Sequence, residues 1–175
     1  PELLKVKGPD VHKEDMGRMI DPYLLEDKDE PGKWWCFYKQ NGVSMSFSYD
    51  LQNWTFFGRA DAGENVCVVV DNDEYLLFHS PENGMARKRS KDLQKWSDDG
   101  ELITLGQKEW PWAAGRITAG AVIDCRHVPH IGRYLMFFHG SGPEPEGKMF
   151  DHFASLGIAW SIDLKKWEWP GKKME

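Results

Sequence analysis

One phrase recurs three times along this chain of 175 residues. The pattern Ser-x-Asp-Leu-x-x-Trp occupies Ser48 to Trp54, Ser90 to Trp96 and Ser161 to Trp167, at intervals of about 40 to 70 residues. Each copy follows apolar stretches that are typical of β-strands. A unit that returns at such a period indicates a repeat architecture, in which one supersecondary unit is stacked several times. The predicted fold class is therefore all-β, a β-propeller whose blades are antiparallel sheets.

The apolar runs divide the chain into three blade units, at about residues 20–58, 64–105 and 116–170. Within each unit, turns of a few residues separate the runs, which favours antiparallel hairpins. Residues 1–17 are polar and are expected to form a loop or an arm. We expect residues 1–175 to form one domain. The domain would be a partial propeller, because three blades cannot close a ring and would leave apolar faces and strand edges exposed.

The aspartates of the turn phrase, Asp50, Asp92 and Asp163, are predicted to be structural. An aspartate at this place can accept hydrogen bonds from backbone groups a few residues downstream, as in an Asx-turn. The tryptophan that ends each phrase is expected to pack between neighbouring sheets. These carboxylates are therefore left out of the candidate catalytic groups.

Composition excludes several classes of partner. The net charge of −6 argues against a nucleic-acid partner, which requires a basic face. No apolar run approaches the roughly 18 residues of a membrane span, and no signal-peptide pattern is visible. Cys36, Cys67 and Cys125 fit neither a zinc pattern nor a disulfide framework and are expected to be free thiols. We expect a soluble protein of unknown compartment, with the cytoplasm slightly favoured.

Two carboxylates stand at the start of the first strand of successive units, Asp21 in the first and Glu64 in the second. In a propeller the first strands line the central channel, so their starts meet at one mouth. Glycoside hydrolysis uses facing carboxyl groups: one protonates the leaving oxygen, while others stabilise charge or activate water. The alternative interpretation is structural: Asp21 caps the turn before Pro22, and Glu64 is a surface residue at the start of a strand.

Three further polar residues end the second strands and are expected at the same mouth, namely Lys39, His79 and His139. Histidine beside a carboxylate can tune proton affinity or donate a hydrogen bond to a sugar hydroxyl. Trp110 and Trp112 flank a proline in an irregular segment, where exposed indoles could stack on sugar rings. Alternatively, the three polar residues only cap their strands, and the two indoles only anchor the loop. Both alternatives remain open.

The order of these motifs resembles the five-bladed propeller glycosidases, the arabinanase/β-xylosidase family 43 and the invertase/levansucrase families. The motifs are Ile20-Asp21-Pro22, the aromatic strand Trp34 to Tyr38, the turn phrase at 48–54, and Glu64. The resemblance covers about residues 18–170. It implies a base or nucleophile aspartate, a second aspartate that stabilises the transition state, and a glutamate acid, one from each of the first three blades. Asp21 then matches the second acid and Glu64 the third.

The chain departs from the family pattern in two ways. The blade that carries the first aspartate would lie before Pro1, and three units stand where five are expected. In the other registration Asp21 is the first aspartate, but the third unit then has Thr118-Ala119-Gly120 where the glutamate belongs. The chain is accordingly expected to be a fragment, to close its ring by pairing with another copy, or to be a truncated glycan-binding relative.

The leading hypothesis is a glycosidase-like propeller that acts on poly- or oligosaccharide, with Glu64 as general acid and Asp21 as its electrostatic partner. Such an acid needs a raised pKa, which a nearby aspartate would supply. The alternatives are a carbohydrate-binding or interaction propeller without catalysis, and a purely structural repeat domain. We expect no cofactor and no metal in the site, and leave a structural calcium ion in the channel open.

Overall fold

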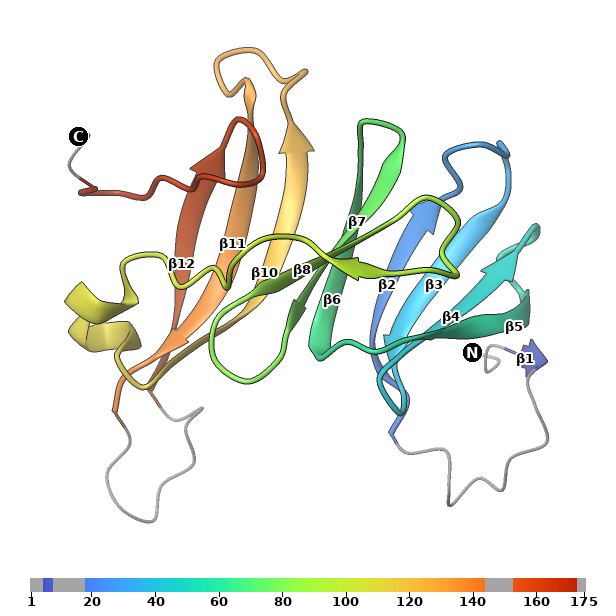
Figure 1. Ribbon diagram of the computed structural model, residues 1–175, viewed down its shortest axis with the longest axis horizontal. Coiled ribbons are helices and arrows are strands. Elements are labelled where there is room, and N and C mark those ends of the chain that lie inside the picture. Colours follow the sequence, from blue (N-terminus) through green and yellow to red (C-terminus); the bar gives the residue numbers. More distant parts are fainter. Residues whose placement is uncertain (1–4, 8–17, 144–152, 173–175) are drawn as a thin grey trace.

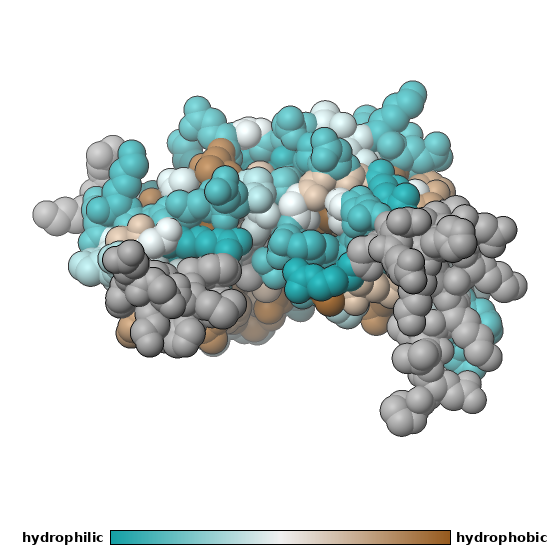
Figure 2. All heavy atoms as spheres, turned by 90° about the horizontal axis from the view of Figure 1, so that it is seen from below, coloured by the Kyte–Doolittle hydropathy of each residue, from teal (hydrophilic) through white to brown (hydrophobic). Residues whose placement is uncertain are grey.

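The computed structural model describes residues 5–7, 18–143 and 153–172. It contains three β-sheets that follow one another side by side, in chain order, across the molecule (Figure 1). We call them blade 1, blade 2 and blade 3. Seen from below, polar side chains cover much of the surface, and apolar side chains gather along one long edge (Figure 2). The predicted all-β propeller architecture is confirmed.

Blade 1 contains five strands in the spatial order β1-β5-β4-β3-β2. Neighbouring strands from β2 to β5 are antiparallel, whereas the short β1 pairs in parallel with β5 at the edge of the sheet. The presence of β1 differs from the loop or arm expected over residues 1–17; the other residues of that segment lie outside the described ones. The strands are β1 (Lys5–Lys7), β2 (Ile20–Glu26), β3 (Trp34–Lys39), β4 (Val43–Ser48) and β5 (Asn53–Ala60).

Blades 2 and 3 are antiparallel throughout, with four and three strands. Two short 3-10 helices, η2 (Gln107–Glu109) and η3 (Pro111–Ala113), lie in the connection between them. No helix of the described part of the chain is long and apolar enough to cross a membrane. The strands are β6 (Glu64–Asp71), β7 (Glu74–Ser80), β8 (Ala86–Ser90) and β9 (Ser97–Asp98), then β10 (Arg116–Cys125), β11 (Arg133–Ser141) and β12 (Ala154–Ser161).

The turn phrase folds in the same way in all three blades, as its first copy shows. Asp50 Oδ1 accepts hydrogen bonds from the backbone N–H groups of Gln52 and Asn53, at 2.9 and 2.7 Å. Ser48 Oγ accepts the N–H of Leu51, whose φ of 60° lies in the left-handed region. Corresponding bonds to the turn aspartate recur at Asp92 and Asp163. The structural role predicted for the turn aspartates is confirmed.

Each blade has two apolar faces, and corresponding residues of the three blades lie on the same one. Trp35 and Phe37 of blade 1 pack against blade 2, and their counterparts on β7, Leu76 and Phe78, pack against blade 3. We call this the forward face of a blade. The alternate residues form the backward face, such as Leu77 of blade 2, which packs on blade 1. The protein core therefore consists of two layers between successive blades, and blade 2 is covered on both sides.

Candidate active site

The first strands of the three blades, β2, β6 and β10, begin at the same lower end of the array (Figure 1). Near its start each has a β-bulge, seen as a register shift against the second strand. Just before the bulge, the paired residues are Ile20 with Lys39, Glu64 with Ser80, and Thr118 with His139. We call this end of the array the mouth. Bulges are common next to active sites because they redirect side chains.

Strand register corrects the alignment expected from the sequence. Glu64 corresponds by register to Ile20 and Thr118, whereas Asp21 corresponds to Asn65. Asp21 and Asn65 have φ values of 55° and 54°. Asp and Asn tolerate this left-handed conformation better than most residues. Both predicted carboxylates are therefore at the mouth, but they are one position apart in the repeat.

Glu64 forms an ion pair with Lys39, across the boundary between blades 1 and 2. Lys39 ends β3 on the forward face and so reaches toward the start of β6. The pair is accessible from solvent, since the Glu64 side chain remains 42% exposed. The arrangement places a charged, reachable carboxylate at the mouth of the array.

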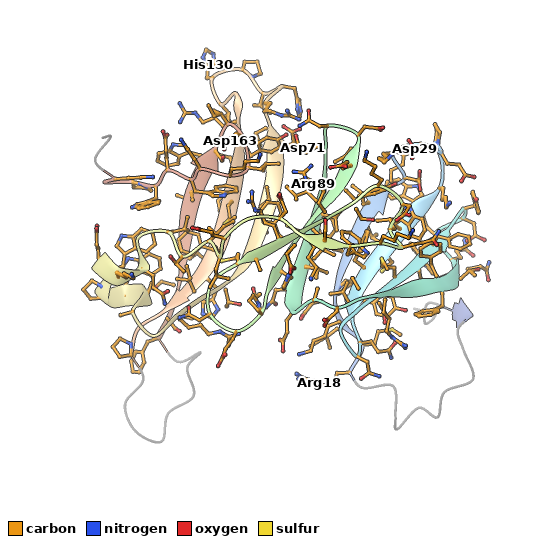
Figure 3. All side chains as sticks on the ribbon, in the orientation of Figure 1. Arg18, Asp29, Asp71, Arg89, His130 and Asp163 are labelled. Atoms are coloured by element: carbon orange, nitrogen blue, oxygen red, sulfur yellow. The ribbon has the colours of Figure 1, made fainter. Side chains whose placement is uncertain are left out.

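The pKa of Glu64 is lowered, chiefly because Lys39 donates a hydrogen bond to the carboxylate. Partial burial acts in the opposite direction, and the positive charges of Lys39, Arg116 and Arg18 lower the pKa further. Figure 3 shows Arg18 at this lower end of the array, far from His130 at the other end. The prediction of a raised pKa is wrong for this state of the site, because cations and not a carboxylate dominate the surroundings of Glu64.

His79 does not occupy the position expected for it. By register Lys39 corresponds to Ser80 and His139, so His79 points to the opposite face of the blade. It is buried, and its Nδ1 accepts a hydrogen bond of 2.9 Å from the backbone N–H of Gly63. Burial, with a contribution from Lys88, lowers its pKa to about 4. His79 thus holds the residue that precedes Glu64.

The corresponding part of blade 3 contains buried polar atoms that have no hydrogen-bond partner among the residues that the structure describes. These atoms are Thr118 Oγ1, His139 Nε2 and Ser141 Oγ. All three residues lie on the forward face, because Thr118 pairs with His139 and Ser141 is two residues further along β11. Sequence reasoning singled out His139 but neither Thr118 nor Ser141 as a site residue. The signal that would have found them is strand register.

The two indoles predicted to bind sugar pack against the core. Trp110 and Trp112 stack on each other at 5.3 Å between ring centroids, and both stack on Phe138. Phe138 lies on the backward face of β11, opposite to His139. The structure therefore gives both indoles a packing role beside η2 and η3 and does not bring them together with Glu64 and Lys39.

No group of three or more His, Cys, Asp or Glu side chains within residues 18–143 and 153–172 is arranged to hold a metal ion. A cavity of about 530 Å³ lies between blades 2 and 3 and is lined by residues such as Arg87, Asp99 and Trp169. It is separate from the mouth residues, so we assign the candidate site to the mouth on strand geometry.

Several solved structures have a fold similar to that of this chain. No protein-family model and no curated protein sequence matches this chain. Among solved structures, it is similar to a glycoside hydrolase, so described, from Parabacteroides distasonis (TM-score 0.61, 16% identity, 89% of this chain and 54% of that one). A thermostable family-43 glycoside hydrolase matches with a TM-score of 0.57 and 15% identity, over 88% and 51% of the two chains.

A fructofuranosidase from Schwanniomyces occidentalis, in complex with fructosylnystose, matches with a TM-score of 0.60 and 11% identity, over 91% of this chain and 35% of that one. This chain thus spans about half the length of the first two structures and a third of the third. The three blades agree with such partial coverage. The chain therefore has the β-propeller fold of the family 43 and fructofuranosidase-type glycoside hydrolases, as a partial array of blades.

Proposed function

We propose that the mouth of this array is the active site of a glycoside hydrolase, with Glu64 as its acid–base carboxylate and Asp21 as a second acidic group. The observation that carries the proposal is the position of Glu64, at the bulged start of β6, partly exposed and held by Lys39. The likeness to glycoside hydrolase propellers supports the same chemistry.

The ion pair determines how Glu64 could act as an acid. A carboxylate bonded to an ammonium group is ionised near neutral pH and cannot protonate a leaving oxygen. A sugar hydroxyl that accepts the hydrogen bond of Lys39 would release Glu64, and exclusion of water by the substrate would then raise its pKa. In this scheme Lys39 belongs to the substrate-binding residues, together with His139.

The test is reducing-sugar release from arabinan, xylan, fructan and galactan by the wild-type chain and by Glu64→Gln. The substitution keeps the size of the side chain but cannot transfer a proton, so release should fall by about 100-fold or more. Glu109→Gln, an exposed position on η2, is the matched control and should keep full activity. Equal release by the wild type and Glu64→Gln would remove Glu64 from the mechanism.

A second candidate function is binding of a glycan without turnover. Two observations favour it: the lowered pKa of Glu64 and the presence of Thr118, not an acid, at the corresponding position of blade 3. In this case no substrate of the panel is cleaved, but oligosaccharide binding, measured by calorimetry, persists in Glu64→Gln and weakens in Lys39→Met.

A further inference from the structure

The forward face of blade 3 is apolar and has no sheet packed on it among the described residues. Its exposed side chains come from all three strands: Ile123 (50% exposed), Phe137 (42%) and Leu156 (84%). They lie on one face because Ile123 pairs with Leu135, Phe137 with Ile158, and His139 with Leu156. Contiguous apolar surface of this kind marks an interaction site.

The backward face of blade 1 is apolar as well. Leu24 pairs with Cys36 on this face and is 50% exposed, as is Met19 beside the strand. A hollow of about 180 Å³ lies beside Met19, and its walls include Pro22, Cys36 and Trp54. The hollow offers space for a large apolar side chain. The two ends of the array are thus one face with projecting side chains and one face with a recess.

The two internal blade boundaries show what kind of surface packs against a forward face. At both internal boundaries a forward face packs against the backward face of the next blade, through Phe37 against blade 2 and Phe78 against blade 3. Phe137 is the counterpart of these two residues on blade 3. The surface that fits blade 3 is therefore a backward face of the same kind as that of blade 1.

The polar end of the blade 3 face agrees with this occupant. At the boundary of blades 1 and 2, Lys39 reaches the start of the next first strand and pairs with Glu64. His139 holds the corresponding position on blade 3, at the end of its second strand on the forward face. A blade 1 placed against this face would bring the start of β2, with Asp21, toward His139.

We propose that two copies of this chain associate head to tail, with the forward face of blade 3 of each copy against the backward face of blade 1 of the other. Each contact is heterologous, and two such contacts close a ring. Two copies of three blades give six, within the range of about four to eight blades found in propellers. The ring would complete the mouth, since His139 of one copy would face Asp21 of the other. The association does not depend on catalysis.

The first measurement is the mass of the purified chain by light scattering during size-exclusion chromatography. The proposal expects twice the monomer mass of 20.2 kDa. Leu156→Asp and Leu24→Asp each place a charge in both contacts of the ring, so each should raise the dissociation constant at least about tenfold. Leu102→Asp is the control, because Leu102 is 46% exposed and lies in the connection between blades 2 and 3, on neither of the two end faces.

Mixing the two variants tests the head-to-tail geometry. A Leu24→Asp copy keeps an intact blade 3 face and a Leu156→Asp copy keeps an intact blade 1 face, so an equal mixture should recover a dimer through one intact contact. Circular dichroism of each variant checks that the sheets are formed. A monomeric wild type would overturn the proposal, as would a mixture that recovers nothing, which indicates contact between like faces. Open-ended assemblies would overturn the closed ring.

Discussion

His79 shows how a single buried side chain can hold the site without touching a substrate. Its unprotonated Nδ1 accepts the N–H of Gly63, which directly precedes Glu64. A Cβ on Gly63 would lie 2.0 Å from the carbonyl oxygen of Ser80, so this backbone has no room to move toward β7. Both contacts come from the end of β7, and they hold the backbone of Gly63, the residue directly before Glu64.

This contact makes stability depend on pH. The pKa of His79 is about 4 in the folded chain, against 6.5 when unperturbed, because of burial first and Lys88 second; Asp98 and Asp61 oppose the shift. The unfolded chain binds more protons between these values, so folding free energy is lost as pH falls from about 6.5 to about 4. His79→Gln keeps a neutral acceptor, and we expect its thermal midpoint to fall less than that of the wild type between pH 7 and pH 5. Parallel pH curves would contradict the prediction.

Lys39 is the second residue with a measurable electrostatic role. Its hydrogen bond is the main reason for the lowered pKa of Glu64, so Lys39→Met should move the titration of the Glu64 carboxyl to higher pH. Carbon-13 NMR of the glutamate side chains measures this shift, with Glu64→Gln to assign the signal. Lys108→Met, an exposed position on η2, should leave the titration where it is. An unchanged Glu64 titration in Lys39→Met would show that the ion pair does not govern the site.

At the scale of elements, the turn phrase is a self-contained unit. In its third copy, Asp163 Oδ1 accepts the N–H groups of Lys165 and Lys166 at 2.9 and 2.8 Å, and Ser161 Oγ donates a hydrogen bond to the same carboxylate. Trp167 then packs edge-on against Phe78 of blade 2, at 6.2 Å between ring centroids. One local network thereby positions a residue that joins two blades.

Asp163→Ala should remove two backbone contacts and lower the free energy of unfolding by about 1–3 kcal/mol. Asp163→Asn keeps an acceptor oxygen and should lose less. Urea unfolding followed by tryptophan fluorescence measures both. Equal losses in the two variants would mean that charge, and not hydrogen bonding, is what the turn requires.

The sequence predicted these turns because all their partners lie within five residues. It missed the strand register, since the apolar pattern does not show which residues pair; by register Asp21 corresponds to Asn65 and not to Glu64. Register likewise separates His79 from Lys39 and His139, which correspond to Ser80. Trp110 and Trp112 were placed at a sugar site because an irregular segment does not reveal that Phe138 lies beneath it.

At the scale of the whole molecule, the repeat alone predicted the stack of three blades. It could not predict the ion pair of Lys39 with Glu64, which joins residues 25 positions apart across a blade boundary. Nor could it show the cations around Glu64, because Arg18, Lys39 and Arg116 come from different blades or connections. Long-range pairing decides the chemistry of the mouth, and local patterns decide the architecture that carries it.

The two-faced blade has a consequence for how such a chain can change over generations. Each blade closes its own turn and presents one forward and one backward face, so a duplicated gene segment that encodes one blade would bring both contacts with it. Neighbouring blades would meet the same kind of surface as before. Lengthening or shortening by whole blades is therefore the change that this architecture tolerates best, whereas loss of part of a blade would expose the interior of a sheet.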